Sequence, residues 1–213
     1  MFDPRAGSFS ERVPVLVLSG GPGEEERKLG TLIHHQAKEI ESQLRIYQEL
    51  TCAARVLDDP RRAAETVHDV VQTVWREQRP GYLEIHRDMV DRRITVPRDI
   101  VTWDGNLHFG RSDEARVAEA VRETAARFNA SRRPFTMVGI ETFRYKLTSE
   151  VRALAERMGA PVTTTVLSKG AFPMDHPLYM GVHIGPISPQ PIVQRVERAD
   201  LVLSLGTPLT DMD

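Results

Sequence analysis

Two adjacent histidines, His34 and His35, are the residues of this chain best suited to chemistry. An imidazole titrates near neutral pH, so either ring can take up or release a proton during a reaction. Adjacent side chains diverge by about 100° on a helix and about 180° on a strand, so the pair is poorly placed to chelate one metal ion. We expect one ring to face a cleft and the other to fix the loop around it. A chance pairing in a structural loop stays open as an alternative.

A glycine cluster, Ser19-Gly20-Gly21-Pro22-Gly23, precedes the histidines and follows an apolar run. The dinucleotide fingerprint G-x-G-x-x-G would need a glycine where Glu26 stands, and the chain has no Gly-Lys-Ser/Thr for a triphosphate loop. The successive acids at 24–26 would also repel phosphate. We interpret the cluster as a tight loop at the carboxyl edge of a sheet, the edge at which ligands usually bind.

The remaining candidates favour structural roles. Cys52 lies in an apolar stretch and is interpreted as a packed thiol, Asp58-Asp59 as a helix cap, and Asp175-His176 as part of a polar loop. Neither a His-Glu-x-x-His motif nor a Cys/His cluster is present in the sequence, so we predict no metal ligands in this chain.

Composition excludes several classes of protein. The 213 residues suit one large or two small domains, and 40% hydrophobic residues can build an ordinary core. A net charge of −2 with interleaved signs argues against nucleic-acid binding. No apolar run is long enough to span a bilayer, and the N-terminus lacks the pattern of a secretory signal. With a single cysteine, a reducing, cytoplasmic location is expected.

The first half of the chain alternates between strand and helix patterns. The run 13–18 predicts a strand buried on both faces, and 51–56 and 82–85 predict two further strands. Between these last two, Asp59-Pro60 is expected to open a helix that ends before Arg79-Pro80-Gly81. The apolar stripe of this helix is Ala63, Val67, Val70, Val71 and Val74.

The second half repeats this alternation. Strands are predicted at 135–140, 161–167 and 201–205. Ser112 is expected to cap a helix with inward-facing Val117, Val121, Thr124 and Phe128. A helix over 146–158 should bury Leu147, Val151, Leu154 and Met158, with Gly159 as its C-cap. Ser188-Pro189 should open a helix with Ile192, Val193 and Val196 on one side.

Such alternation predicts an α/β fold made of two doubly wound, Rossmann-like parallel-sheet units. We place the units at 1–91 and 112–213, with a linker over 92–111. The second unit is expected to be incomplete at its C-terminal end, because a last parallel strand is normally followed by a covering helix. A naturally small, two-lobed protein stays open as an alternative.

Taken in order, the motifs resemble one enzyme family. The segments SGGPG (19–23), His34-His35, LTCAARVLDD (50–59) and RPGYLEIHRDM (79–89) resemble the second half of the pyrimidine-binding domain of thiamine-diphosphate-dependent 2-oxo acid decarboxylases, the group that acts on pyruvate, indolepyruvate and phenylpyruvate. Three later segments resemble the Rossmann-like central domain of that family: 138–147, 167–188 and 199–213. His86 departs from the family pattern, which more often has proline there.

The resemblance implies a carboxy-lyase that uses thiamine diphosphate as electron sink, with Mg²⁺, on an aromatic or branched 2-oxo acid. It assigns catalysis to His34 and His35, and cofactor contacts to Gly21, Gly23 and His35. The family's activating glutamate and its Gly-Asp-Gly…Asn motif, which holds diphosphate and magnesium, have no counterpart here. We therefore expect a fragment that is inactive alone and whose intact enzyme is a dimer or tetramer.

Two other functions stay open. A carboligase of the acetolactate synthase type shares the domain plan, although the histidine pair is more typical of the decarboxylases. A non-catalytic, Rossmann-like binding or assembly module would also show two wound units without a complete phosphate motif.

Overall fold

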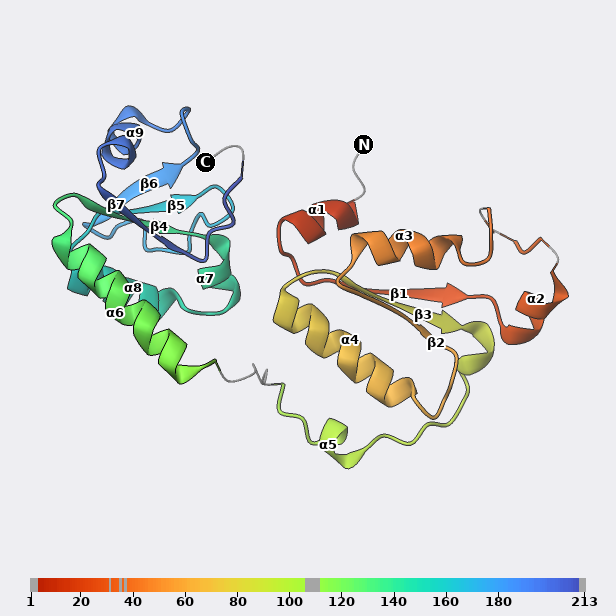
Figure 1. Cartoon of the computed structure of the whole chain (residues 1–213). Coiled ribbons are helices and arrows are strands. Elements are labelled where there is room, and N and C mark those ends of the chain that lie inside the picture. The colour runs from red at the N-terminus through yellow and green to blue at the C-terminus, as the bar shows by residue number, and fades with distance from the viewer. Residues whose placement is uncertain (1–3, 31, 35, 37, 106–111, 211–213) are drawn as a thin grey trace. The chain divides into compact units, whose positions relative to one another are not determined.

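The computed structural model describes residues 4–30, 32–34, 36, 38–105 and 112–210. The chain divides into two compact units, Met1–Gly110 and Arg111–Asp213, each with its own sheet (Figure 1). Every pairing between the described strands is parallel. The predicted fold class, two parallel-sheet units of the α/β type, is therefore confirmed.

The first unit has a three-stranded sheet with helices on both faces. Its strands lie in the order β1 (Leu16–Gly21), β3 (Gly81–His86) and β2 (Ala53–Leu57). Helices α3 (Ser42–Leu50) and α4 (Ala63–Glu77) lie on opposite faces (Figure 1). The shorter helices are α1 (Pro4–Ser10), α2 (Glu24–Leu29), the 3-10 turn η1 (Arg87–Met89) and α5 (Arg98–Val101).

Packing of α4 against the sheet forms the core of this unit. Its inward stripe joins the strands in one buried cluster of Ala53, Val70, Val74 and Leu83. Val70 and Val74 are four residues apart and therefore lie on one face of α4, as predicted. The start of α4 was predicted wrongly. Asp59 does not cap it, because its carboxylate accepts from the backbone nitrogen of Arg61 (2.9 Å) and closes a turn before the helix begins.

Strand β1 was also predicted wrongly, as a strand buried on both faces. It begins at Leu16, continues through Ser19 to Gly21, and its side chains alternate between exposed and half-buried. The reason is its position, since β1 pairs with β3 alone among the described strands and α4 packs on β2 and β3. Leu18 is consequently 62% exposed. The glycine loop that we predicted from residue 19 begins only after Gly21.

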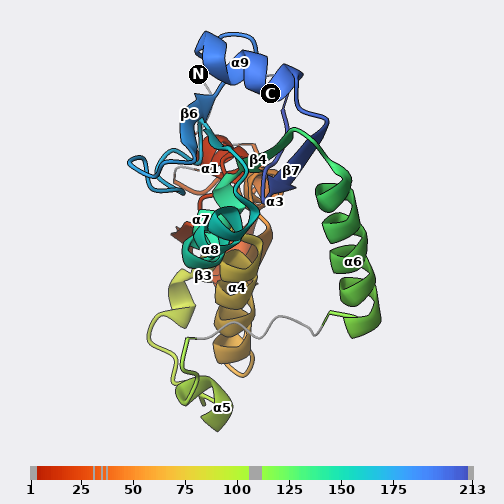
Figure 2. The ribbon, with the colours of Figure 1, turned by 90° about the vertical axis from the view of Figure 1, so that its left-hand side faces the viewer.

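The second unit has a four-stranded sheet in the order β6 (Tyr179–His183), β5 (Val162–Thr165), β4 (Pro134–Val138) and β7 (Leu201–Leu205). Its helices are α6 (Glu114–Ala130), α7 (Ile140–Arg144), α8 (Thr148–Met158) and α9 (Gln190–Glu197). Both views place α9 on one side of the sheet and α6 and α8 on the other (Figures 1 and 2). The core includes Val138, Val151, Ala155, Val162 and Phe172.

Three predictions for two helices of this unit are corrected. Asp113, not Ser112, caps α6, since its carboxylate accepts from the backbone nitrogens of Ala115 (3.0 Å) and Arg116 (3.1 Å). Most of the predicted stripe of α6 is exposed, since Val117 is 48% and Val121 62% exposed, and Phe128 is half-buried. In α8 the buried face is Val151 and Ala155, so the predicted Leu147 and Leu154 point away from the core and are exposed.

Candidate functional site

The carboxyl ends of β1 and β3 form the rim of a hollow in the first unit. It has a volume of about 620 Å³, and its lining includes Gly20, Gly21, Pro22, His34, Ile85 and Arg87. This size lies within the range of small-molecule pockets, and the carboxyl edge of a parallel sheet is their usual place. The structure thus brings the glycine turn, by which we mean Gly20–Gly23 at the end of β1, and His34, the first histidine of the pair, to one hollow.

A second hollow, of about 770 Å³, lies at the carboxyl end of β2. Its lining is charged and contains no histidine, and its charges are paired locally, as in Arg61–Asp59 at 2.8 Å. These neighbours hold the pKa of Asp59 at about 2, chiefly through the hydrogen bonds from Arg61. We take the smaller hollow as the candidate site, because its lining includes a histidine, a side chain that can exchange protons near neutral pH.

His34 is an exposed residue of the segment between α2 and α3. A local turn supports it, in which the backbone nitrogen of Gln36 donates to the carbonyl of Ile33 (2.9 Å). The Gln36 side chain accepts in return from the nitrogen of Ile33 (3.1 Å). His35, predicted for both catalysis and cofactor contact, lies outside the described residues.

The two glycines predicted to contact a cofactor differ in their surroundings. Gly21 ends β1 opposite His86, and a side chain there would begin 2.7 Å from the Oε1 atom of Glu84. Gly23 is the N-cap of α2, and its backbone nitrogen donates to Glu26 Oε2 (2.9 Å). Gly21 therefore allows the close approach of a buried carboxylate, whereas the amide of Gly23 is already engaged within its own helix turn.

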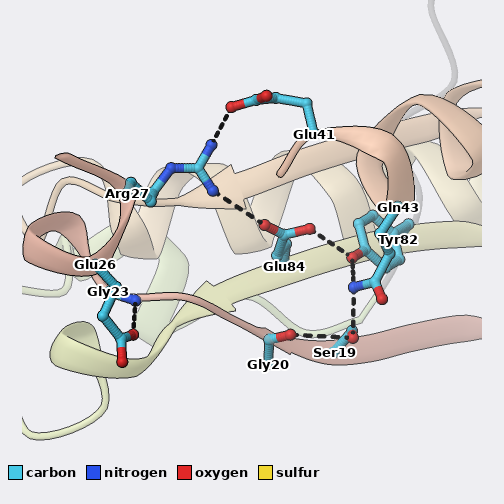
Figure 3. A network of polar contacts seen from close by, with 9 residues as sticks. All are labelled: Ser19, Gly20, Gly23, Glu26, Arg27, Glu41, Gln43, Tyr82 and Glu84. Carbon is cyan, nitrogen blue, oxygen red and sulfur yellow. Dashed lines mark hydrogen bonds and ion pairs between the residues drawn. The ribbon is translucent and has the colours of Figure 1, made fainter. Parts of the chain in front are cut away.

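A polar network behind the glycine turn was missed by the sequence analysis (Figure 3). Its centre is Glu84, which is 3% exposed. The Oε2 atom of Glu84 accepts a hydrogen bond from the hydroxyl of Tyr82 (2.8 Å). The Gln43 amide donates to that hydroxyl (2.7 Å) and to Ser19 Oγ (2.9 Å). Burial, and then the bond to Glu84, raise the pKa of Tyr82 to about 12. One signal was present in the sequence, an acid within the apolar strand YLEIH.

Charged contacts join α2 to the end of β3. Arg27 reaches Glu84, with Nη1 3.9 Å from Oε1, and Arg87 pairs with Glu26 at 2.8 Å. Asp88 accepts from the backbone nitrogen of Glu24 (3.1 Å), and that bond is the main reason its pKa is lowered. Together these contacts hold the glycine turn between two well-anchored elements.

The other candidates have structural surroundings. Cys52 is half-buried, its Sγ lies 3.7 Å from the carbonyl of Arg79, and burial raises its pKa, as suits a packed thiol. His176 lies 3.3 Å from Glu156 and accepts through Nδ1 from the nitrogen of Leu178. Over the described ranges, no group of three or more His, Cys, Asp or Glu side chains could hold a metal ion.

Comparison with known proteins gives a consistent picture. Residues 121–213 match the family model described as "Thiamine pyrophosphate enzyme, central domain". Over 211 residues, 99% of this chain, the sequence is 33% identical to indole-3-pyruvate decarboxylase of Azospirillum brasilense, of which it covers 37%. It is 28% identical over 210 residues to pyruvate decarboxylase isozyme 2 of Saccharomyces cerevisiae, again covering 37%. For pyruvate decarboxylase 1 of Pisum sativum the identity is 27% and the coverage 35%.

The chain thus spans little more than a third of the length of the curated relatives that it matches. Among the helices of the described residues, none combines the length and apolarity needed to cross a membrane.

Proposed function

Because the chain belongs, as a partial chain, to the family of thiamine-diphosphate-dependent 2-oxo acid decarboxylases, we propose that it forms part of a carboxy-lyase. The proposed reaction is the non-oxidative removal of carbon dioxide from a 2-oxo acid. The observation that carries the proposal is the place of His34, which lines a hollow beside Gly20 and Gly21 in a chain similar to such enzymes over 99% of its length.

The described residues fit the aromatic rings of thiamine diphosphate better than its diphosphate and the accompanying Mg²⁺. The hollow combines apolar side chains such as Ile85 and Val90 with His34, which suits an aromatic ring system and a polar substrate. For Mg²⁺ the described residues supply no ligand set. We propose that magnesium and diphosphate are held by other parts of a longer protein. When bound, thiamine diphosphate supplies the electron sink for decarboxylation.

The chain's own residues have narrower tasks in this proposal. His34 and His35 transfer protons to and from the reacting substrate and place its carboxylate. Gly21 leaves room for the buried carboxylate of Glu84, since a side chain at this position would begin 2.7 Å from Glu84 Oε1. Gly23 contributes by starting α2, and any contact with the cofactor itself would need its carbonyl or Cα, because its amide is engaged.

Finer features of the function follow from the same family. We propose an aromatic or branched substrate, supported by 33% identity to an indole-3-pyruvate decarboxylase against 28% to a pyruvate decarboxylase. We also propose a homo-oligomeric enzyme in the cytoplasm, where the lone Cys52 would stay reduced. No observation in the structure favours the carboligase, which product analysis would reveal by an acetohydroxy acid in place of an aldehyde.

A chimera tests the role of His34. This chain would replace the matching 37% of the Azospirillum brasilense indole-3-pyruvate decarboxylase, and turnover of indolepyruvate would be measured. We expect His34→Gln to lower kcat by about 10²- to 10⁴-fold, the usual contribution of acid–base catalysis.

The matched control is His68→Gln, because His68 lies on α4, bonds to Gln72 and does not line the hollow. It should leave kcat nearly unchanged. A His34→Gln chimera as active as its parent would overturn the assignment.

A further inference from the structure

We propose that Arg92-Arg93 is a processing site, at which an endoprotease specific for paired basic residues cuts the native chain. Such a protease holds two successive basic side chains in acidic subsites, where carboxylates bind guanidinium groups well. Water attacks the carbonyl carbon of Arg93, its hydroxyl stays on that carbon, and a proton passes to the nitrogen of Ile94 as the peptide bond breaks. The proposal does not depend on the proposed decarboxylase function.

The sequence contains four pairs of adjacent basic residues, and the structure distinguishes among them. They are Arg27-Lys28, Arg61-Arg62, Arg92-Arg93 and Arg132-Arg133. Exposure of the side chains does not separate them, since Lys28 is 60% and Arg61 86% exposed. A protease must also bind the backbone, so the deciding feature is how firmly the backbone of each pair is held.

Two of the pairs lie in hydrogen-bonded backbone of the first unit. Arg27-Lys28 belongs to α2, and the amide of Arg27 bonds to the carbonyl of Gly23 (3.1 Å). In Arg61-Arg62 both amides bond to Asp59, at 2.9 Å to its carboxylate and at 3.1 Å to its carbonyl. A protease would have to open the helix in the first case and this turn in the second, and such local opening costs free energy.

The pair Arg132-Arg133 of the second unit is held by a longer-range contact. Its two amides bond to the carboxylate of Asp200, at 2.9 and 2.8 Å. Asp200 lies directly before β7 and the pair directly before β4, so this carboxylate joins the starts of two paired strands. The bond after Arg133 also precedes Pro134, whose ring replaces the amide hydrogen. Both features protect this pair from cleavage.

Arg92-Arg93 has the opposite surroundings. Residues 92–97 lie outside any helix, strand or turn, and 90–96 are exposed without interruption. Within the described residues, no backbone group of 93–96 makes a hydrogen bond. Arg92 has local contacts, its amide with the carbonyl of Met89 (3.1 Å) and its Nε with that of Asp88 (3.2 Å). Of the four pairs, this one therefore requires the least opening of the backbone.

Cleavage after Arg93 leaves both core clusters whole. The cluster of the first unit ends in sequence at Leu83, and that of the second begins at Val138. The product 1–93 keeps the three strands of the first sheet and the residues that line the hollow beside His34. The product 94–213 keeps the second sheet. We therefore expect two folded products that resist further cutting.

The test is digestion of the whole native chain by a paired-basic endoprotease of the kexin class, followed by mass spectrometry. We expect 1–93 and 94–213 as the first products. Arg92→Gln should slow their appearance at least about 30-fold, the scale of removing one partner of a buried charge pair in the protease subsite. Arg62→Gln is the matched control, and it should leave the rate unchanged because the cut does not use that pair.

Two synthetic peptides, 57–66 and 88–97, show whether the fold or the local sequence decides. They present Arg61-Arg62 and Arg92-Arg93 without tertiary structure. The preference for Arg92-Arg93 should be at least about tenfold greater in the chain than between the peptides, because Arg61-Arg62 must first open. A first cut at another pair, equal preferences in chain and peptides, or a native chain that stays intact while peptide 88–97 is cut would overturn the proposal.

Discussion

Tyr82 is the residue through which the polar network meets the core of the first unit. It is fully buried, its ring stacks on Tyr47 with centroids 3.9 Å apart, and its hydroxyl bonds to both Glu84 and Gln43. Removing the hydroxyl would leave a buried carboxylate oxygen without its donor. Hydrogen bonds to charged groups contribute more to stability than neutral ones, so the network depends on this atom.

We predict that Tyr82→Phe lowers the free energy of unfolding by about 1–3 kcal/mol, the cost of an unsatisfied buried charged group. Urea unfolding followed by circular dichroism would measure it. Tyr179→Phe is the matched control, because the Tyr179 hydroxyl bonds to a neutral partner, Thr164, at 2.9 Å. An equal or smaller loss for Tyr82→Phe would show that the carboxylate does not depend on this donor.

The hydrogen bond between Tyr82 and Glu84 should also make stability depend on pH in the alkaline range. The folded pKa of Tyr82 is raised to about 12, chiefly by burial, whereas an unfolded tyrosine ionises near pH 10. The unfolded state therefore loses its proton first, and stability is lost as pH rises from about 10 to 12. In Tyr82→Phe the fall over this window should be shallower. A parent and a variant with parallel profiles of unfolding midpoint against pH would contradict this.

Local motifs identified only part of the candidate site. His34 and Gly21 were found from the sequence, because adjacent imidazoles and a glycine after a strand are visible without a fold. Glu84 and Arg27 were not found, since their approach depends on the register of β3 against β1 and on the direction of α2. Arg27 and Glu84 are 57 residues apart in the sequence, and no local sequence pattern links two residues at that separation.

At the scale of elements, β4 is where the second sheet reverses its order. Two later strands lie on one side of it and β7 on the other. Ligands of Rossmann-like sheets usually bind outside this switch point. Here Gly139, directly after β4, donates to the Leu205 carbonyl (2.9 Å), and Glu141 donates to that of Gly206 (3.1 Å). The chain's own backbone fills the switch point, which disfavours a nucleotide-binding module.

We predict that Gly139→Ala destabilises the second unit by about 1–3 kcal/mol, as overpacking does. Its Cβ would lie 2.1 Å from the carbonyl oxygen of Gly206 and 2.3 Å from Thr207 Cα, so backbone would have to move. Thermal unfolding would measure the loss. Gly20→Ala is the control, because nothing lies within 4 Å of its added Cβ. If the two variants melt alike, the close approach is not needed for stability.

Elements with their own local signals were predicted well from the sequence. Strand β7 has the predicted bounds, Leu201–Leu205, and α4 buries most of its predicted stripe. The errors for β1 and α6 share one physical cause. An apolar pattern indicates a face that can be buried, but not which neighbour buries it, so β1 and α6 were predicted to be covered. Strand β6 was missed because Gly181, at a φ of 121°, interrupts its pattern beside a register shift.

At the scale of the whole molecule, two facts support our proposal that this chain is one part of a larger enzyme. It covers 37% of the indole-3-pyruvate decarboxylase that it resembles, and its described residues include no cluster able to hold a metal ion. A thiamine diphosphate site needs its diphosphate and magnesium anchored, because they carry most of the charge of the cofactor. In the function that we propose, the hollow beside His34 is therefore one wall of a site.

We predict that the purified chain, given thiamine diphosphate, Mg²⁺ and phenylpyruvate, releases no carbon dioxide above a blank without protein. The physical reason is that His34 can move a proton only where the cofactor is held, and the described residues lack the anchor. The A. brasilense enzyme with indolepyruvate serves as the positive control for the assay. Release above the blank that disappears in His34→Gln would show that 213 residues suffice, and that the cofactor is held by groups we have not assigned.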